Sequence, residues 1–242
     1  LFLAQGAPHR AVALASWYTL AYRPVFTGDP DTATQSQMLT ALARSLRAEV
    51  GRITLEHVPA DTAAQLHARL DAALEIAPQL EPFVPALRAA YDLVAERTGP
   101  VAVQRVHGDY HLGQVLRAQD GWVLLDFEGE PTRPLAERTA LMSPLRDVAG
   151  MLRSFDYAAR HLLAERHGDS QLAYRATEWA ERNRQAFCDG YARAAGADPR
   201  DEPVLLRAFE LDKAVYEVVY ESRNRPSWLP IPVGSIARLA SS

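Results

Sequence analysis

The sequence lacks the features typical of secreted, membrane-spanning and nucleic-acid-binding proteins. It contains one cysteine, Cys188, so no disulfide can form within the chain, which is typical of a protein in the reducing cytoplasm. No apolar run approaches the roughly 20 residues that a membrane-spanning helix needs. The net charge of −4 gives no indication of general binding to nucleic acid. We therefore expect a cytoplasmic protein with no membrane or nucleic-acid partner.

Lysine and phosphate-binding glycine motifs are also scarce. Lys213 is the only lysine among 26 basic residues. The sequence contains no GxxxxGK[ST] motif, and its first residues show no glycine-rich strand–turn–strand. The same residues lack the basic region and cleavage site of a signal peptide. We interpret them as the interior of a longer protein.

Helical periodicity dominates what is present. Apolar residues at helical spacing predict helices over residues 34–57, 62–76, 81–97, 143–167, 170–195 and 203–222. Three prolines in "NRPSWLPIPVG" are expected to exclude helix after that point. In the middle of the chain, "VAVQRVHG", "VLR" and "WVLLDF" predict short strands, the last two joined as a hairpin. We predict one mostly α-helical domain, residues 1–242, with a small β-hairpin element.

Acidic residues lie at the ends of these predicted strands, in "VHGDYHLGQVLRAQDGWVLLDFEGEP", residues 106–131. Asp109 is followed five residues later by Gln114, and Asp126 comes after the hairpin, which folds it back beside the first pair. Phosphoryl transfer needs a carboxylate facing the attacking hydroxyl and oxygen ligands for Mg²⁺. Either fragment alone would indicate an ordinary turn or strand end. Together they predict that Asp109 accepts the hydroxyl proton and that Gln114 and Asp126 bind the metal.

The segments "HGDYHLGQVL" and "LDFEGEP" resemble the catalytic and metal loops of the aminoglycoside phosphotransferase-like kinases, and more narrowly those of bacterial maltokinases. "SPLRDVAGMLRSF" and "ELDKAVYEVVYESRNRPSWLPIP" resemble maltokinase segments too, so the resemblance covers residues 101–239, with a fainter part over 39–57. It implies the C-terminal lobe of a eukaryotic-protein-kinase-like fold. The N-terminal lobe, absent here, is expected in the parent protein. The resemblance also implies ATP as co-substrate, Mg²⁺ as cofactor and maltose 1-phosphate as product.

Carried over by motif, the resemblance implies Asp109 as catalytic base, with Glu128 as a further metal ligand beside Gln114 and Asp126. Asp147 resembles the helix aspartate that anchors the catalytic loop in these kinases, and Arg146 is expected to support the loop with it. The alternative for Asp147 is a surface acid paired with Arg146.

Histidines on either side of Asp109 have different expected roles. His107 is expected to support the loop through hydrogen bonds rather than to titrate. His111 either faces the sugar or packs as a neutral ring.

The helix before residue 228 carries the other candidates for sugar binding. Tyr216 and Tyr220 are four residues apart on one face, with Lys213 one turn earlier. Aromatic rings can cover the C–H surface of a sugar while charged groups bind its hydroxyls, although tyrosines at this spacing are also typical of a core. The substrate-binding candidates, placed in the catalytic loop and within residues 203–228, are His111, Lys213, Tyr216, Tyr220, Glu221 and Arg225.

Three other functions compete with a maltose kinase. An amino-sugar or aminoglycoside phosphotransferase needs acidic groups for ammonium, and the candidates are Asp29, Asp31, Asp156 and Glu178. A non-catalytic binding module would be expected to have a degenerate catalytic loop, but this loop is intact. A zinc hydrolase would need a histidine-rich ligand set, which the sequence does not contain.

Overall fold

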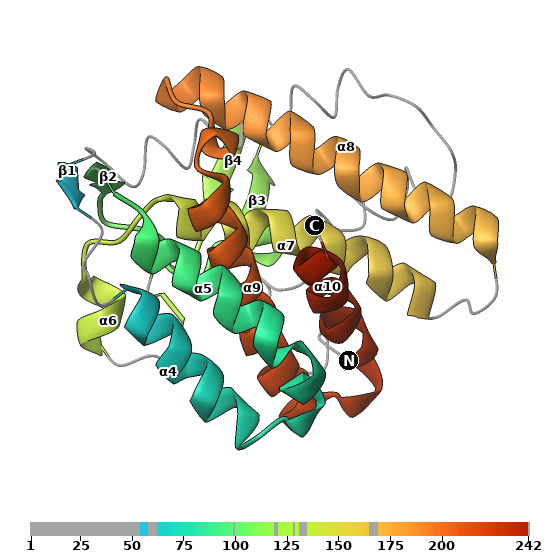
Figure 1. Cartoon of the computed structure of the whole chain (residues 1–242). Coiled ribbons are helices and arrows are strands. Elements are labelled where there is room, and N and C mark those ends of the chain that lie inside the picture. The colour runs from blue at the N-terminus through green and yellow to red at the C-terminus, as the bar shows by residue number, and fades with distance from the viewer. Residues whose placement is uncertain are drawn as a thin grey trace.

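The computed structural model describes residues 54–57, 62–98, 100–118, 121–127, 129–130, 135–164 and 169–241 (Figure 1). The helices in this part of the chain are α4 (Thr62–Leu74), α5 (Val84–Glu96), α6 (Leu135–Thr139), α7 (Leu145–Ala164), α8 (Ser170–Ala195), α9 (Pro203–Asn224) and α10 (Pro230–Ser241). The strands are β1 (Thr54–His57), β2 (Pro100–Val103), β3 (Val115–Ala118) and β4 (Gly121–Leu124).

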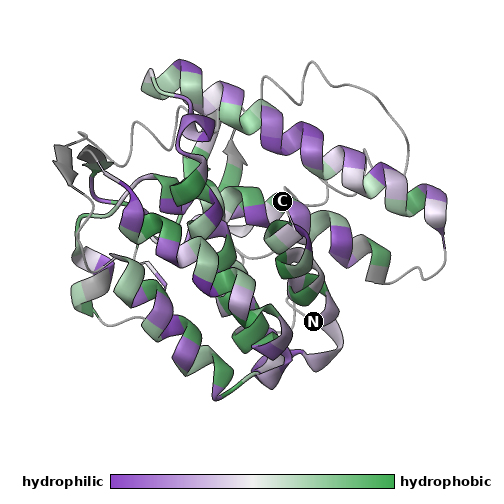
Figure 2. Ribbon diagram, in the orientation of Figure 1, coloured by the Kyte–Doolittle hydropathy of each residue, from purple (hydrophilic) through white to green (hydrophobic). Residues whose placement is uncertain are grey.

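Helices α7 and α9 form the centre of the bundle. α9 packs against α4, α5, α7 and α10, while α8 lies along the other side of α7. Because α9 has neighbours on several sides, apolar residues around most of its circumference are buried, among them Leu205, Leu211, Ala214 and Val218. Figure 2 shows hydrophilic residues over much of α8, which lies at the edge of the bundle.

Buried ion pairs join the central helices as well. Arg153 of α7 is 1% exposed and donates to Asp156, one turn away, and to Glu217 of α9 at 2.6 Å. Asp156 also accepts from Arg160, Arg238 and Ser235, so it ties α10 to α7. Charges taken out of water cost energy unless each has close partners, and these have them.

The strands form two separate antiparallel pairs. β3 and β4 are the predicted hairpin, with Val115 opposite Leu124, and β1 pairs with β2, with Thr54 opposite Val103. A further bridge joins Gln104 to Met142, next to the start of α7. This bridge lies directly before residues 107–112, which hydrogen-bond to α7.

The predicted helices are confirmed in the described residues, with shifted ends and two corrections. Residues 54–57 lie in a strand, so the prediction of helix through residue 57 is wrong there, because pairing with β2 overrides the helical spacing. Residues 34–53 lie outside the described part. The prediction that prolines exclude helix after α9 is also wrong. Pro230 and Pro232 lie in the first turn of α10, where no N–H is needed for the helical ladder.

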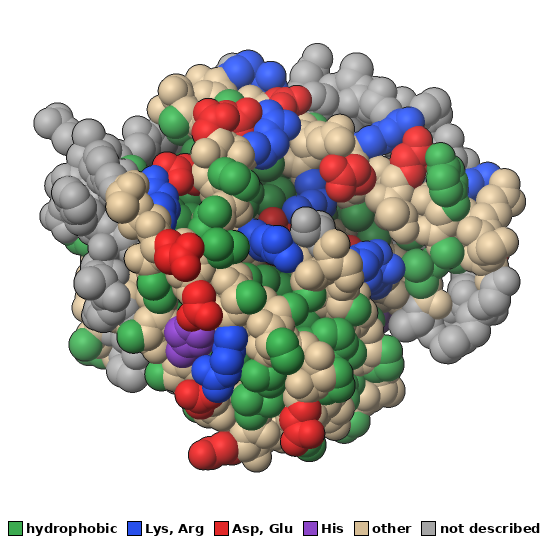
Figure 3. Space-filling view, in the orientation of Figure 1, with side chains coloured by type: hydrophobic (Ala, Val, Ile, Leu, Met, Phe, Trp, Pro, Cys, Tyr) green, Lys and Arg blue, Asp and Glu red, His purple; other side chains and the backbone are tan. Residues whose placement is uncertain are grey.

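The surface carries no dominant charge on the face that Figure 3 shows. Acidic and basic side chains of the described residues are interspersed there. Among the described helices, none is long and apolar enough to cross a membrane.

Candidate active site

The backbone before Asp109 is held by the first turn of α7. Asp147 accepts hydrogen bonds from the backbone N–H groups of His107 at 2.7 Å and Gly108 at 2.9 Å. The Asp147 side chain is buried, so it is not a surface acid. Gly108 has φ +84°, a conformation that glycine adopts without strain. The loop therefore turns sharply at Gly108 and presents Asp109 beside α7.

The loop also touches α7 directly. A Cβ atom built at Gly150 would lie 2.6 Å from the backbone oxygen of Tyr110, so glycine is what allows this approach. One turn further, Ser154 accepts a hydrogen bond from the backbone N–H of Leu112 at 2.9 Å. Three positions on one face of α7 thus fix the loop from residue 107 to residue 112.

His107 joins the two acidic motifs. Its Nε2 donates to the backbone oxygen of Leu125 at 2.7 Å, while its Nδ1 accepts from the backbone N–H of Asp109 at 3.4 Å. The ring is 1% exposed and lies 4.8 Å from the ring of Phe127. His107 therefore holds the segment after β4 against the loop that carries Asp109.

Gln114 and Asp126 lie side by side, as the hairpin predicted. The Gln114 backbone oxygen accepts from Leu125 N at 2.9 Å, and its side-chain Nε2 lies 3.1 Å from Asp126 Oδ2. Asp126 has φ +63°, a left-handed conformation that aspartate tolerates better than most residues. Glu128, the third predicted ligand, lies outside the described residues.

This pair fits Mg²⁺ but forms no complete cage. Mg²⁺ takes few protein oxygens and fills its other positions with water and phosphate oxygens. Rotation of the Gln114 amide would present its oxygen beside the Asp126 carboxylate. Within the described residues, no group of three or more histidine, cysteine, aspartate and glutamate side chains could hold a metal ion.

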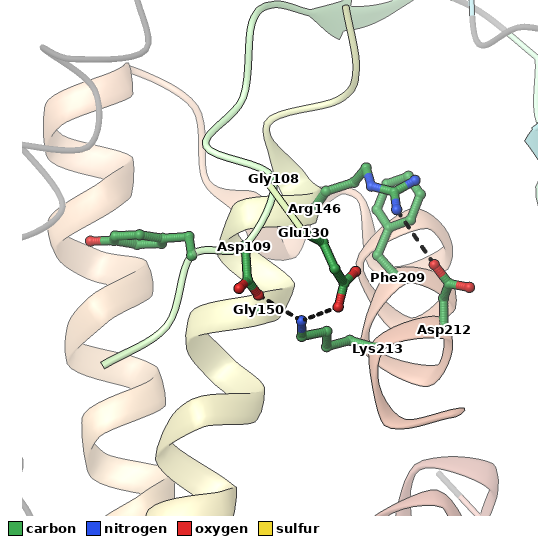
Figure 4. A pocket seen from close by; sticks show the side chains of 9 residues that line it. Gly108, Asp109, Glu130, Arg146, Gly150, Phe209, Asp212 and Lys213 are labelled. Atoms are coloured by element: carbon green, nitrogen blue, oxygen red, sulfur yellow. Dashed lines mark hydrogen bonds and ion pairs between the residues drawn. The ribbon is translucent and has the colours of Figure 1, made fainter. Parts of the chain in front are cut away.

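The carboxylates of Asp109 and Glu130 both contact the ammonium group of Lys213. Lys213 Nζ of α9 lies 2.9 Å from Asp109 Oδ1 and 3.2 Å from Glu130 Oε1, and Figure 4 shows both carboxylates pointing at it. Burial alone would raise the pKa of Asp109, but Lys213 and the nearby histidines outweigh burial and lower that pKa. Burial would lower the pKa of Lys213, yet Glu130 and Asp109 raise it. Asp109 and Lys213 therefore form an ion pair, with the Glu130 carboxylate on the other side of the ammonium group.

His111 lies on the other side of the Asp109 carboxylate. Its Nδ1 accepts from Gly113 N at 3.0 Å, which places the proton of a neutral ring on Nε2. That Nε2 lies 3.8 Å from Asp109 Oδ2, and the side chain is 38% exposed. The His111 ring is therefore partly exposed and lies close to the Asp109 carboxylate.

Arg146 and Asp212 form a second charged group, on the other side of the pocket that Asp109 lines. Arg146 lies 3.6 Å from Asp212 and 5.5 Å from the centre of the Phe209 ring. Asp212 also accepts from Arg69 of α4 at 2.8 Å. Together with Gly108, Asp109, Glu130 and Lys213, these side chains line a small pocket between the loop, α7 and α9 (Figure 4).

The remaining substrate candidates follow α9 away from this pocket. The Tyr216 ring lies 4.6 Å from Lys213 Nζ, and the Tyr220 ring lies 6.3 Å from that of Tyr216. Glu221 is buried and accepts from Tyr157 and from Arg225, the latter at 2.7 and 2.9 Å. Glu221 and Arg225 are thus bonded to each other at the far end of the helix.

The acids considered for an ammonium group lie elsewhere. Asp156 is surrounded by arginines in the core network, and Glu178 pairs with Arg182 on the exposed side of α8. Asp29 and Asp31 lie outside the described residues.

Sequence reasoning missed Glu130 and Gly150. The signal for Glu130 was the second glutamate of "DFEGE", and the signal for Gly150 was a glycine inside a strong helical pattern.

The chain matches one family model and is similar to glucosamine kinases of two organisms. A family model described as "Phosphotransferase enzyme family" matches residues 15–197. A glucosamine kinase of Streptacidiphilus jiangxiensis is 28% identical over 228 residues, covering 90% of this chain and 51% of the relative. A glucosamine kinase of Mycolicibacterium smegmatis is 33% identical over 137 residues, covering 55% of this chain and 33% of the relative. The chain thus spans about half the length of the first of these relatives and a third of the second.

Solved structures show the same likeness. A glucosamine kinase in crystal form B has a TM-score of 0.76 and 26% identity, with 95% of this chain and 57% of that chain covered. A glucosamine kinase in complex with glucosamine, ADP and inorganic phosphate has a TM-score of 0.75 and 27% identity, with 95% and 59% covered.

Proposed function

Because the chain belongs to the phosphotransferase enzyme family, we propose that it carries the catalytic loop of an ATP- and Mg²⁺-dependent sugar kinase. The observation that carries the proposal is the loop of Asp109, which Asp147 fixes and which the His107 ring joins to Leu125, directly before the adjacent pair of Asp126 and Gln114. A base next to a pair of metal-binding oxygens is the arrangement that phosphoryl transfer requires. An N-terminal lobe in the complete protein would supply the rest of the nucleotide site.

Each residue has a defined part in the proposed reaction. The acceptor hydroxyl oxygen bonds to the γ-phosphorus, the bond to the β–γ bridging oxygen breaks, and ADP leaves. Asp109 takes the hydroxyl proton, because its carboxylate is ionised and partly open to solvent. Gln114 and Asp126, with Glu128 as a third ligand, would hold Mg²⁺, which neutralises phosphate charge when bound.

Maltose remains the acceptor that the sequence motifs indicate, and an amino sugar such as glucosamine is the second candidate. Two observations favour the amino sugar. The named relatives are glucosamine kinases, and the cluster of Asp109, Glu130 and Lys213 has two carboxylates and one ammonium group. A half-buried site with carboxylates in its lining attracts an ammonium group.

Phosphorus NMR of the complete protein with ATP, Mg²⁺ and a panel of sugars tests the proposal. A product phosphate coupled to the anomeric proton of maltose supports the maltose assignment. A phosphate on another hydroxyl, or on glucosamine, supports the amino-sugar assignment. If no sugar in a broad panel gains a phosphate, the sugar-kinase proposal fails.

Tyr220 offers a way to separate a disaccharide from a monosaccharide. It lies seven residues along α9 from Lys213, about 10 Å at the helical rise, and its side chain is 41% exposed. A second sugar ring could reach it, whereas a single ring bound at Asp109 could not. Tyr220→Ala should therefore raise KM for maltose several-fold and leave KM for glucosamine unchanged.

The matched control is Tyr174→Ala, since Tyr174 is 69% exposed on α8, away from this helix. It should change neither KM in steady-state assays. Equal effects of both substitutions on maltose would remove Tyr220 from the acceptor site.

A further inference from the structure

The sole lysine of the chain lies against the proposed base rather than against solvent. Lys213 Nζ contacts Asp109 Oδ1 at 2.9 Å, and this contact takes one of the two carboxylate oxygens. The other oxygen, Oδ2, faces His111 Nε2 at 3.8 Å. The two oxygens are therefore not equivalent, and Oδ2 is the oxygen without the ammonium contact.

Glu130 holds Lys213 from the other side. Its carboxylate is 2% exposed and lies 3.2 Å from Nζ, so it can neither be rehydrated nor move away without a large cost. The lysine stem rises from α9, where Leu211 and Ala214 on either side are fully buried. The ammonium group is thus fixed by the helix, by Glu130 and by the ring of Tyr216 at 4.6 Å.

We propose that Lys213 is a positioning residue for the proposed reaction: its ammonium group orients Asp109 through Oδ1 and keeps the carboxylate ionised, while Glu130 anchors the ammonium group. This inference rests on the proposed function, since Asp109 is a base only if the chain transfers a phosphoryl group. It gives Lys213 a task different from sugar binding. Lys213 acts through Asp109, and its contact with Asp109 exists without any sugar.

Other charged groups surround Asp109, and the test must separate Lys213 from them. They are His107 and His111 from the loop, Glu130 from the segment after β4, Arg146 and Asp147 from α7, and Asp212 and Glu217 from α9. Among the charged groups that lower the pKa of Asp109, Lys213 has the largest effect, ahead of the two histidines. Removal of Lys213 should therefore raise the pKa of Asp109 towards the value that burial favours.

The experiment measures the titration of Asp109 directly in the complete protein. Aspartate labelled with ¹³C at Cγ is followed by NMR against pH, with Asp109→Asn to assign the signal. In Lys213→Met the midpoint should rise by about one pH unit or more. In Lys213→Arg, which keeps the charge, it should stay near its original value. This readout needs no enzyme activity, so a failure of the kinase proposal leaves it interpretable.

A double variant separates charge from folding. Lys213→Met takes the ammonium group away from the buried Glu130 carboxylate and should lower the melting temperature. Lys213→Met/Glu130→Gln removes that anion, so it should recover stability and still show the raised midpoint. Because Glu130→Gln alone should lower the pKa of Asp109, it is the reference for the double variant. An unchanged midpoint in folded Lys213→Met against the original protein, or in the double variant against Glu130→Gln, would overturn the proposal.

Kinetics provide the second readout if the protein phosphorylates a sugar. Since the base acts when deprotonated, the acid limb of kcat/KM should move to higher pH in the double variant by the same amount as the NMR midpoint. KM for the sugar should change little while kcat falls roughly tenfold to a hundredfold. A rise in KM alone, with no shift of the acid limb, would make Lys213 a sugar ligand and contradict the positioning role.

Discussion

Asp109 has two carboxylate oxygens in different surroundings. Oδ1 bonds to Lys213, whereas Oδ2 faces His111 and the more open side of the loop. The backbone around it is fixed by Asp147 and His107, so the side chain has little freedom to choose another orientation. A carboxylate prepared in this way can accept a proton without first rearranging the loop.

Asp109→Asn should therefore abolish transfer without unfolding the protein. The amide keeps the size and can still be held in the loop, but it cannot take a proton, so kcat should fall by roughly 10²- to 10⁴-fold. Single-turnover phosphate transfer and the melting temperature measure the two effects separately.

Asp189→Asn is the control, because Asp189 is an exposed acid on α8 that pairs with Arg200. It should retain full turnover. Near-normal turnover of Asp109→Asn would mean that another group is the base.

Among the elements, α7 supports more of the site than any other described helix. Asp147, Gly150 and Ser154 lie on one face, because residues three and four apart share a side of a helix. The first accepts two loop N–H groups, the second allows close backbone approach and the third accepts the N–H of Leu112. α7 also packs on α8, where Phe155 contacts Trp179 and Phe187. A shift of this helix would consequently move the whole catalytic loop.

Gly150→Ala tests that dependence. The new methyl group would meet Tyr110 O at 2.6 Å, so the loop must move away from α7, at a cost of about 1–3 kcal/mol in the free energy of unfolding. Because the same movement displaces Asp109, kcat should fall by more than the stability loss explains. Urea unfolding and steady-state kinetics give the two quantities.

Gly234→Ala in α10 is the matched substitution. A Cβ atom there would find only the end of the Arg238 side chain at 3.7 Å, so the variant should gain up to about 1 kcal/mol from helix propensity and keep its activity. If Gly150→Ala behaved like Gly234→Ala, the close approach would have no functional importance.

For the whole molecule, the charge network around Asp156 links folding to pH. Burial would raise the pKa of Asp156, but Arg153, Arg238, Arg160 and a hydrogen bond from Ser235 lower it well below its usual value. The unfolded chain then binds a proton at a pH where the folded protein does not. Stability from this group is present above about pH 4, the unfolded pKa, and is lost as pH falls towards the folded pKa.

Asp156→Asn should accordingly flatten the acid side of the stability curve. At pH 7 the variant should unfold at a lower urea concentration than the original protein, because its arginines lose their shared anion. Below pH 4 the difference should shrink. Urea midpoints between pH 7 and pH 3 measure both, and parallel curves for the two proteins would contradict this account.

Local sequence patterns predicted the helices where periodicity and tertiary packing agree. Helices α5, α7 and α8 were predicted within a few residues, and so was the hairpin that brings Asp126 to Gln114. Residues 54–57 were predicted incorrectly because their state depends on pairing with β2, over 40 residues away. α10 was missed because the prolines were read as helix breakers, although their place in the first turn makes them compatible with helix.

The candidate site was predictable as far as the acidic motifs extend. Spacing located Asp109, Gln114 and Asp126, since the turn and the hairpin are local. Spacing could not show that Lys213, 104 residues after Asp109, meets its carboxylate, or that Glu130 completes the contact. It also could not distinguish Glu221, which is bonded to Arg225, from a free ligand. These relations depend on how α9 packs, and the sequence of one segment does not contain that information.

A single lysine also makes α9 a site for measuring how often the folded protein opens. A lysine-specific endoprotease has one target in these 242 residues, the peptide bond after Lys213, and that bond lies in the middle of a helix with four helical neighbours. A protease needs an extended segment in its active site, so it can cut there only after α9 has separated from its neighbours and unwound. The rate of that one cut therefore reports the population of the opened state.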